Sequence, residues 1–550
     1  MSIPAIIRSQ VDPAAVTKVT RLFNNTLGDV LSELIQNARR AGATVVDLCV
    51  TEAGGMPYLT VSDDGAGIED PSVILALGRS GWDDMVSRRE DPAGMGVFSL
   101  AGRQVEVRSC ARTTGEGWRI EIGSDDWESG TPISVTSCSH PFGTQFRVPL
   151  DEQWAKALDA AAQNAARYCP LPVRLNGTLL KRQDWLEGAD TIVERDGVRI
   201  GLFNDYRATR FSPSVNFHGV TVICPLPSVG EKDRNWWVRV DIVDAPDLQL
   251  VLPARKEMVE NQSLVELRTT VRRTIYRHIQ SLGSHRLPYE QWREAEDLGI
   301  VLPEARPELA AWAPSRADYN SDAVRSGPLS GDNLLLVDHF GSALEQCADF
   351  ALAKDGRFDG RLATPDDTMS GYAWYDRLAR VTGLRFEVVK DGETFALGTA
   401  DFPGLESGPV DRLDLILEIS GPTAETVVIF APVAIEYDDG LCCTFEEANI
   451  LLASTEAVTP SELVHLLEGV CFCSSDDRDA DSWDTQHDRF LLDAQEMTTR
   501  LLLGDDAALI ERLRAILAYR AQWFVPEGRQ FMAVIGRDAI DVRIEPLPAG

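Results

Sequence analysis

The chain has 550 residues, 44% of them hydrophobic and 25% charged, and a formal net charge of −32 at pH 7. This composition indicates an ordinary globular protein of several domains and argues against wholesale disorder. The acidic charge repels phosphate backbones and anionic lipid heads, so nucleic acid is disfavoured as a partner. The sequence shows neither an apolar run of ~18 residues nor a signal peptide, which predicts a cytoplasmic protein without a membrane partner.

The first predicted element is a helix with two polar residues on one face. Apolar residues recur at helical spacing from Leu22 to Ala38, which is the pattern of an amphipathic helix, and Gly42 favours its termination. Glu33 and Asn37 are four residues apart and therefore share a face. Taken alone, this segment favours the interpretation that the face with these two residues is turned to solvent, because most helices have a polar side.

Two strands follow, and the second, at residues 58–62, leads into a glycine-rich loop. The loop reads Asp-Asp-Gly-Ala-Gly-Ile over residues 63–68. Gly65 and Gly67 flank a small residue, which lets the backbone approach a ligand closely. The carboxylate of Asp63 at the strand end can accept a hydrogen bond from an exocyclic amine.

A further glycine cluster begins the next predicted helix. It reads Gly94-Met95-Gly96-Val97-Phe98-Ser99, and backbone N–H groups at a glycine-rich helix start form a phosphate site. The polar, glycine-bounded segment at residues 78–96 is typical of a lid. Strand patterns follow at residues 104–109, 117–122 and 133–136, and Gly143-Thr144 opens the last strand of the unit.

The order of these motifs resembles that of the GHKL ATPase superfamily, which holds gyrase, the ninety-kilodalton heat-shock chaperones, histidine kinases and the MutL repair proteins. The matching motifs are Glu33-x-x-x-Asn37-Ala38, Asp63-x-Gly65-x-Gly67-Ile68, Gly94-x-Gly96-x-x-Ser99 and the late Gly143-Thr144 strand. The resemblance implies an N-terminal α/β sandwich ATPase domain of the Bergerat type at residues 1–150, with ATP and Mg²⁺ as cofactors. Histidine kinases carry a phospho-accepting histidine upstream of this domain, whereas the first histidine here is His140, so that branch is disfavoured.

The resemblance also implies a role for each matching residue. Glu33 would be the general base that activates the attacking water, and Asn37 would ligate Mg²⁺. Asp63 would accept a hydrogen bond from the adenine amino group. The other nucleotide-binding residues would be Gly65 and Gly67 beneath the nucleotide, Ile68 of the same motif, Gly94 and Gly96 at the phosphates, and Thr144 near the adenine. Hydrolysis of ATP to ADP and phosphate needs charge neutralisation and a positioned base rather than covalent chemistry. Asp64 occupies a variable position and receives no role.

Residues 151–285 predict a β-rich second domain. Its predicted elements are a helix at 154–168, a hairpin with Asn176-Gly177 at its turn, strand-like runs at 192–202, 215–224 and 236–243, and a long amphipathic helix that ends at Ile279. This block resembles the transducer domain of gyrase, MutL and the heat-shock chaperones. The segment around Lys256 resembles the chaperone version most, which implies that Lys256 reaches the γ-phosphate. The chaperones have an arginine at this point, so the neighbouring Arg255 stays an alternative.

Residues 286–550 match no family and predict a C-terminal mixed α/β region. A strongly β-branched run at 426–435 predicts a central strand. Helical patterns occur at 342–353, 446–452, 460–467, 488–503 and 506–524. The predicted fold class of the whole chain is therefore α+β.

We predict from these features an ATP-binding and slowly hydrolysing conformational switch that resembles a heat-shock chaperone. It would form a homodimer and bind a protein client or partner through residues 286–550. Two alternatives remain: a DNA-acting GHKL ATPase of the MutL or topoisomerase type, and a nucleotide-gated interaction module in bacterial stress or phage defence.

Overall fold

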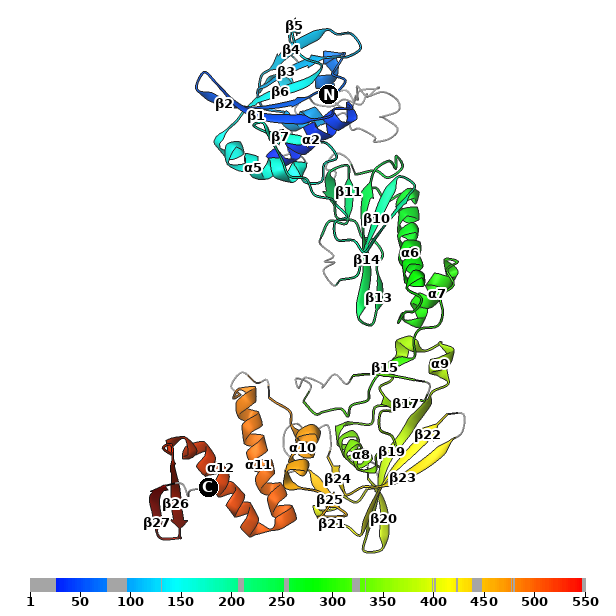
Figure 1. Cartoon of the computed structure of the whole chain (residues 1–550), viewed down its shortest axis with the longest axis vertical. Helices are drawn as coiled ribbons and strands as arrows, with labels where there is room; N and C mark the ends of the chain where they lie inside the picture. The colour runs from blue at the N-terminus through cyan, green and yellow to red at the C-terminus, as the bar shows by residue number, and fades with distance from the viewer. Residues whose placement is uncertain are drawn as a thin grey trace, which may run out of the picture. The chain divides into compact units, whose positions relative to one another are not determined.

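The computed structural model describes residues 26–76, 96–129, 131–205, 212–251, 257–318, 327–331, 333–397, 399, 402–421, 424–437, 448–475, 477 and 480–546. The chain divides into two compact units, Met1–Pro303 and Glu304–Gly550, which are described separately. Both units combine large sheets with packed helices, which confirms the predicted α+β class (Figure 1). Among the helices of these residues, none is both long and apolar enough to cross a membrane.

An eight-stranded sheet in the order β5-β4-β3-β6-β2-β1-β7-β8 forms the N-terminal domain. Its strands are β1 (Val46–Ala53), β2 (Met56–Asp63), β3 (Val105–Cys110), β4 (Gly117–Ile122), β5 (Thr136–Ser137), β6 (Gly143–Pro149), β7 (Val173–Leu175) and β8 (Thr178–Leu179). The helices are α2 (Leu27–Arg40), η1 (Pro71–Leu75), η2 (Gly96–Leu100), α4 (Asp126–Ser129) and α5 (Glu152–Ala166). One hydrophobic core joins α2 and α5 to the sheet.

The helix α2 begins where a side chain caps its free N–H groups. The Thr26 hydroxyl accepts a hydrogen bond from Asp29 N at 3.1 Å, as an N-cap residue does. The face that carries Val30, Leu34 and Ala38 is buried against the core. Burial of this stripe, at roughly 1.5–3 kcal/mol for each large side chain, fixes which face of α2 is turned away from the sheet.

The first sheet continues beyond residue 150, where the sequence suggested a domain boundary. Strand β7 pairs in parallel with β1, with Val173 opposite Val46. The turn between β7 and β8 is Asn176-Gly177, as predicted, and both residues have positive φ angles of 48° and 80°, which suits the Asn-Gly hairpin turn. The core that α5 and β7 complete is the core of the N-terminal domain.

A second sheet in the same unit has the order β12-β11-β14-β10-β9, with β13 paired to β14. The strands are β9 (Thr191–Arg195), β10 (Val198–Phe203), β11 (Val215–Phe217), β12 (Val220–Val222), β13 (Val229–Glu231) and β14 (Arg234–Ile242), followed by α6 (Gln262–Leu282) and α7 (Tyr289–Asp297). Helix α6 packs on this sheet through its apolar stripe. The predicted runs at 192–202 and 215–224 are each a hairpin of two strands, with turns at Asp196-Gly197 and His218-Gly219.

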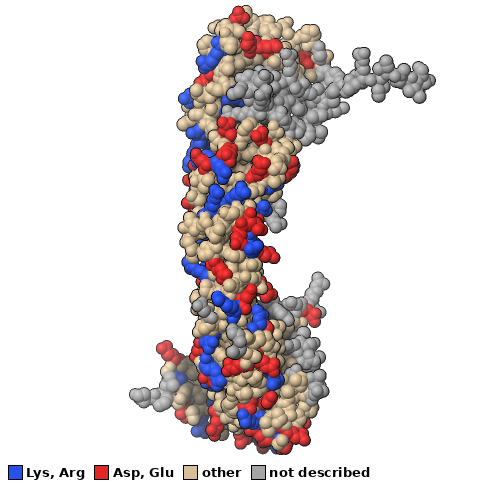
Figure 2. All heavy atoms as spheres, turned by 90° about the vertical axis from the view of Figure 1, so that its right-hand side faces the viewer, with Lys and Arg blue, Asp and Glu red and all other residues tan. Residues whose placement is uncertain are grey.

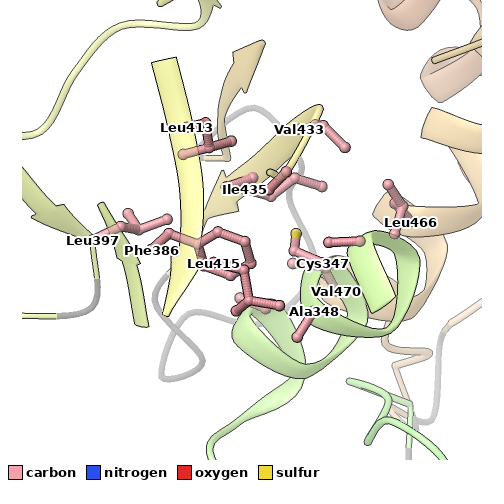
Figure 3. Close-up of a cluster of buried hydrophobic side chains, with 14 of the residues drawn as sticks. Cys347, Ala348, Phe386, Leu397, Leu413, Leu415, Val433, Ile435, Leu466 and Val470 are labelled. Carbon is pink, nitrogen blue, oxygen red and sulfur yellow. The ribbon is translucent and has the colours of Figure 1, made fainter. Parts of the chain in front are cut away.

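The C-terminal unit is built around a third large sheet. Its strand order is β18-β17-β19-β22-β23, with β20 paired to β19, and a smaller sheet has the order β21-β25-β24. The bounds are β15 (Glu308–Ala310), β16 (Pro328–Ser330), β17 (Leu335–Val337), α8 (Ser342–Asp355), β18 (Leu362–Ala363), η3 (Asp367–Met369), α9 (Ala373–Asp376), β19 (Ala379–Lys390), β20 (Glu393–Leu397), β21 (Gly408–Pro409), β22 (Arg412–Ser420), β23 (Glu425–Phe430), β24 (Val433–Glu436) and β25 (Asn449–Leu452). Figure 3 shows Cys347 and Ala348 of α8 beside Phe386 and Leu415 of the sheet in the core of this unit.

Two predictions for this unit were wrong. The run at 426–435 is not one central strand, because β23 ends at Phe430 on the edge of the large sheet and β24 belongs to the smaller one. The pattern at 446–452 is not a helix where it is described, because Asn449–Leu452 is strand β25. Apolar runs this short carry no period that separates a strand from a helix.

The chain ends in helices and a hairpin. These elements are α10 (Pro460–Cys471), α11 (Trp483–Leu503), α12 (Asp505–Arg520), η5 (Gln522–Phe524), β26 (Arg529–Ile535) and β27 (Ile540–Pro546). Helices α10 and α11 join the core of the C-terminal unit, and α12 packs beside α11 (Figure 1). Strands β26 and β27 form a separate two-stranded sheet.

Candidate functional site

The loop Asp63–Ile68 leaves the end of β2 and lies against the C-terminal end of α2. The Ala66 N–H donates a hydrogen bond to Ala41 O at 2.8 Å. A Cβ atom at Gly65 would lie 2.7 Å from the Cβ of Ala41, closer than real Cβ contacts come. Gly65 therefore has no side chain because the helix end leaves no room for one.

The other side of this loop lies against the end of β3. Gly67 has a φ of +74°, and a Cβ atom there would lie 2.2 Å from Cys110 O. The Arg112 N–H donates to Ala66 O at 2.9 Å, and Ile68 N donates to the Ser109 hydroxyl at 2.8 Å. The loop is thus held between α2 and β3 at a spacing that only glycine at residue 67 allows.

Ser109 connects this loop to the start of β6, a role that sequence reasoning missed. Its side chain is buried, and its hydroxyl donates to Gly143 O at 2.9 Å. The Thr144 hydroxyl lies 3.0 Å from the Ser109 hydroxyl oxygen, and since the Ser109 proton is already donated to Gly143 O, Thr144 is the donor. The available signal was a polar residue at the inward position that follows Val105 and Val107 in the strand alternation.

Asp63 is the acceptor at the centre of this arrangement. Its carboxylate accepts a hydrogen bond from Gly65 N at 2.9 Å and another from the Thr144 N–H. Burial raises the pKa of Asp63 to about 6, because loss of water outweighs these two hydrogen bonds, and the nearby Asp64 adds to the rise. At neutral pH the side chain is therefore mostly ionised and acts only as an acceptor.

Asp64 holds the loop in place by contacts that the sequence did not reveal. Its carboxylate accepts hydrogen bonds from Thr44 N at 2.7 Å and Val45 N at 3.1 Å, and from the Thr44 hydroxyl. Partial burial would raise the pKa of Asp64, but these hydrogen bonds outweigh it and hold the pKa below its usual range. The two neighbouring carboxylates thus have opposite environments. Burial disfavours the ionised form of Asp63, whereas hydrogen-bond donors stabilise the ionised form of Asp64.

The polar face of α2 lies next to the loop, and it is not a plain solvent-facing side. Glu33 is buried, with 8% of its surface exposed. Asn37 is half-buried, its side-chain oxygen accepts from Arg40 Nη1 at 3.1 Å, and its backbone oxygen accepts from Ala41 N at 2.9 Å. Since the backbone oxygen of Ala41 contacts the loop, Asn37 lies one helical turn away from the point where the loop meets α2.

Gly96 begins η2, which packs against α2. The structure thus brings the loop Asp63–Ile68 to the C-terminal end of α2 and, through Ser109, to Thr144. Gly94, Arg255, Lys256 and the rest of the lid segment before Gly96 lie outside the described residues.

Gln36 is a further residue that the sequence did not single out. It lies on α2 between Glu33 and Asn37, is 4% exposed, and donates through Nε2 to His218 O. His218 forms the turn between β11 and β12 with a φ of 53°. The helix that carries the polar face therefore contacts the second sheet directly.

The residues that are described suit an adenine nucleotide in their chemistry. An acceptor carboxylate beside a hydroxyl, Asp63 beside Thr144, matches a base that presents an amine donor. Asn37 offers the kind of oxygen that Mg²⁺ takes, and its side-chain oxygen keeps one lone pair beside the hydrogen bond from Arg40. No cluster of three or more His, Cys, Asp or Glu side chains suited to a metal occurs among the described residues.

No model of a protein family matches the chain. The DNA mismatch repair protein MutL of Pseudomonas putida is 33% identical over 128 residues, covering 22% of this chain and 19% of that protein. MutL of Gemmatimonas aurantiaca is 33% identical over 152 residues, which is 24% of each protein. The chain thus spans about a fifth to a quarter of the length of these curated relatives.

Among solved structures, the ATPase region of Saccharomyces cerevisiae topoisomerase II covers 42% of this chain and 76% of its own, at 13% identity and a TM-score of 0.30. The ATPase and transducer domains of topoisomerase II from Balamuthia mandrillaris cover 36% of this chain and 61% of their own, at 14% identity and a TM-score of 0.29. These scores are too low to carry an argument.

The MutL relatives and the ordered motifs place the N-terminal domain in the GHKL superfamily of ATPases. The heat-shock chaperone branch, which the segment around Lys256 suggested, is not represented by the relatives reported above and stays a prediction.

Proposed function

We propose that the chain binds ATP between α2 and the loop Asp63–Ile68, hydrolyses it slowly, and uses the nucleotide to switch its own conformation. The proposal includes a homodimer and a protein client or partner that binds through residues 286–550, as in a heat-shock chaperone. The observation that supports it best is the loop itself, whose acceptor carboxylate is positioned by α2, β3 and β6.

Glu33 is the proposed general base, and Asn37 the proposed Mg²⁺ ligand. A base acts best when little water surrounds it, and Glu33 is buried. Mg²⁺, when bound, would neutralise charge on the phosphates. Because the phosphates repel each other and any nearby carboxylate, the nucleotide also needs cations from the protein, and Lys256 or Arg255 is proposed for the γ-phosphate.

The contact between Gln36 and His218 supports the proposed switch. Gln36 is one residue from Asn37 and three from Glu33, on the same buried helix. A small rotation of α2 on nucleotide binding would break or strengthen its hydrogen bond to the β11–β12 turn. A ligand can drive such a change only by its different affinity for the two arrangements.

Phosphate release and nucleotide binding test this function together. Glu33→Ala should bind Mg-ATP like the wild type and lose at least about 100-fold in hydrolysis, which is the usual contribution of a general base. Glu52→Ala, which changes an exposed glutamate at the end of β1, is the matched control and should behave like the wild type. Wild-type turnover in Glu33→Ala would refute the assignment, whereas binding without turnover in the wild type would favour a nucleotide-gated interaction module.

A DNA-acting ATPase is the second candidate, and two observations favour it. The relatives are named for DNA mismatch repair. Arg273 and Arg277 lie four residues apart on α6 and are exposed, so they share a face that phosphates can approach. Against it, acidic side chains are interspersed with basic ones over the face in Figure 2, and the net charge is −32.

A mobility shift with duplex DNA at increasing salt separates the two candidates. A DNA-binding protein should lose affinity steeply with salt, and the double variant Arg273→Glu with Arg277→Glu should reduce both the affinity and the salt dependence. The absence of a shift at low salt would leave the switch without DNA as the better account.

A further inference from the structure

Strand β23 forms one edge of the large sheet in the C-terminal unit, next to β22 (Figure 1). The N–H of Ala431, one residue beyond β23, donates to Leu413 O of β22 at 3.0 Å. In an antiparallel pair, residues that bond to the neighbouring strand alternate with residues that do not. The register continues from this bond without a bulge, so Thr426, Val428 and Phe430 turn their N–H and C=O groups away from β22, towards the open edge.

The part of the chain that the structure describes leaves this edge uncovered. No described strand pairs with the outer side of β23, and no described loop forms a backbone hydrogen bond with Thr426, Val428 or Phe430. The other end of the sheet differs, because Trp312 N donates to Leu362 O of β18 at 2.9 Å. Proteins often protect an edge strand with a lysine, a proline or a bulge, and β23 contains none of these. Its unpaired N–H and C=O groups are therefore a template for another strand.

The same edge carries exposed apolar side chains. Val428 is 49% exposed and Phe430 is 55% exposed. They lie on the face opposite to Val427 and Ile429, which belong to the core of the unit. A strand added beside β23 would place every second side chain next to Val428 and Phe430. The backbone would then supply the hydrogen bonds, and these two side chains would select apolar residues at alternate positions of the added strand.

The charge of the C-terminal unit indicates which strand fits. Residues 304–550 hold 20 lysines and arginines and 45 aspartates and glutamates, a net charge of −25, whereas residues 1–303 carry −7. Glu425, the first residue of β23, is exposed at the edge itself. A field of this sign attracts a basic segment and repels a second copy of the same acidic unit. The occupant that fits the edge is therefore a basic, extended segment of another protein.

We propose that β23 binds an extended, basic segment of a partner protein as an additional strand of the large sheet. Apolar side chains at alternate positions of this segment contact Val428 and Phe430, and lysines or arginines flank them. The proposal rests on the partner binding proposed above for residues 286–550 and specifies the chemistry of that partner. It does not involve ATP. Peptide binding measured without nucleotide can therefore fail while ATP hydrolysis stands, and the reverse holds as well.

Fluorescence anisotropy of a labelled peptide with the full chain, without nucleotide, tests this site. The probe Lys-Lys-Val-Thr-Val-Thr-Val-Lys-Lys should bind, and the same peptide with glutamates in place of the lysines should bind at least about 10-fold more weakly. An acidic peptide that binds equally well would overturn the proposal.

Methylation of single backbone nitrogens in the probe tests the strand pairing without any change in the protein. In an added strand, the N–H groups of alternate residues face β23. Methylation should therefore weaken binding at least about 10-fold either at the valines or at the threonines, and leave it within a few-fold at the other set. Equal effects at both sets, or no effect at either, would contradict binding as a strand.

Two variants at one residue locate the site on β23. Val428→Pro removes an N–H at the open edge and leaves the hydrogen bonds to β22 in place, and edge strands tolerate proline there. It should weaken binding of the basic probe at least about 10-fold. Val428→Thr keeps the N–H and the β-branched shape, so this matched control should bind within a few-fold of the wild type. Circular dichroism of both variants checks that they are folded.

Three results would overturn the assignment to this edge. The first is wild-type affinity of Val428→Pro for the basic probe, and the second is an equal loss of affinity in Val428→Thr. The third is self-association of the wild type, in sedimentation equilibrium, that Val428→Pro abolishes, because the edge would then pair with a second copy of this chain.

Discussion

Replacement of Asp63 by asparagine should stabilise the unliganded protein while it removes nucleotide binding. Burial raises the pKa of Asp63 from 3.8 to about 6, and since each pKa unit corresponds to about 1.4 kcal/mol, ionisation of this carboxyl in the folded state costs about 3 kcal/mol. The asparagine carries no charge but offers one acceptor oxygen in place of two, and the loss of this acceptor costs about 1 kcal/mol of stability. The expected net gain at neutral pH is therefore about 2 kcal/mol, or roughly 4–8 °C for a domain of 150–250 residues.

The stability difference between the wild type and Asp63→Asn should depend on pH. The folded protein binds the Asp63 proton more tightly than the unfolded chain, because folding raises the pKa. The wild type therefore gains stability as pH falls through about 6 towards 3.8. Asp63→Asn lacks this gain, so its net advantage should be full above pH ~7, vanish near pH ~4.5, where the ionisation cost that remains in the wild type equals the ~1 kcal/mol of the lost acceptor, and reverse below it.

Calorimetric unfolding over this pH range measures the effect, on the transition that Mg-ATP raises in the wild type. Asp64→Asn is the control with the opposite sign. Hydrogen bonds from Thr44 and Val45 hold the pKa of Asp64 below its usual range. Removal of the Asp64 carboxylate should therefore lower the free energy of unfolding by about 1–2 kcal/mol at neutral pH. An Asp63→Asn protein less stable than the wild type above pH ~7 would refute the argument that burial dominates at Asp63.

Three further substitutions test the architecture of the site. Ser109→Ala removes a buried hydroxyl that joins the loop to β6 and should cost about 1–3 kcal/mol in unfolding free energy and weaken ATP binding, as urea titration and calorimetry would measure. Gly67→Ala places a Cβ 2.2 Å from a backbone oxygen and should cost at least ~2 kcal/mol, whereas Gly115→Ala, with a φ of +70° and open space around it, should cost only about 1 kcal/mol; equal losses would contradict the close packing. Gln36→Ala should leave ATP affinity within a few-fold but abolish any nucleotide-dependent change in hydrogen exchange of the β11–β12 turn, and an unchanged exchange response would show that coupling takes another route.

The parts of the site that the sequence predicts are those that depend on local rules. Asn37 and Glu33 follow from helical spacing, and Gly65 and Gly67 from the close approach that only glycine allows. The Asn176-Gly177 turn follows from its dipeptide. The Asp196-Gly197 turn carries the same signal, but the long β-rich run around it favoured one strand, so the hairpin of β9 and β10 was missed.

The parts that were missed depend on contacts between distant residues. Ser109 is a polar residue in a strand until β6 and the loop are placed beside it. Asp64 acquires its role only because Thr44 lies 20 residues away in sequence and 2.7 Å away in space. Strand β23 reads as central because it is β-branched, yet the sheet order puts it at an edge, and no local pattern encodes that order.

Titration calorimetry with ATP and GTP tests the central claim most directly. The claim is that Asp63 accepts a hydrogen bond from the adenine amino group. Guanine has a carbonyl oxygen where adenine has that amine, so GTP would set two acceptors against each other and should bind at least ~100-fold more weakly than ATP. Tight binding of ATP with this discrimination, lost in Asp63→Asn, is the predicted result; equal affinity for ATP and GTP, or unaltered ATP binding by Asp63→Asn, would contradict it.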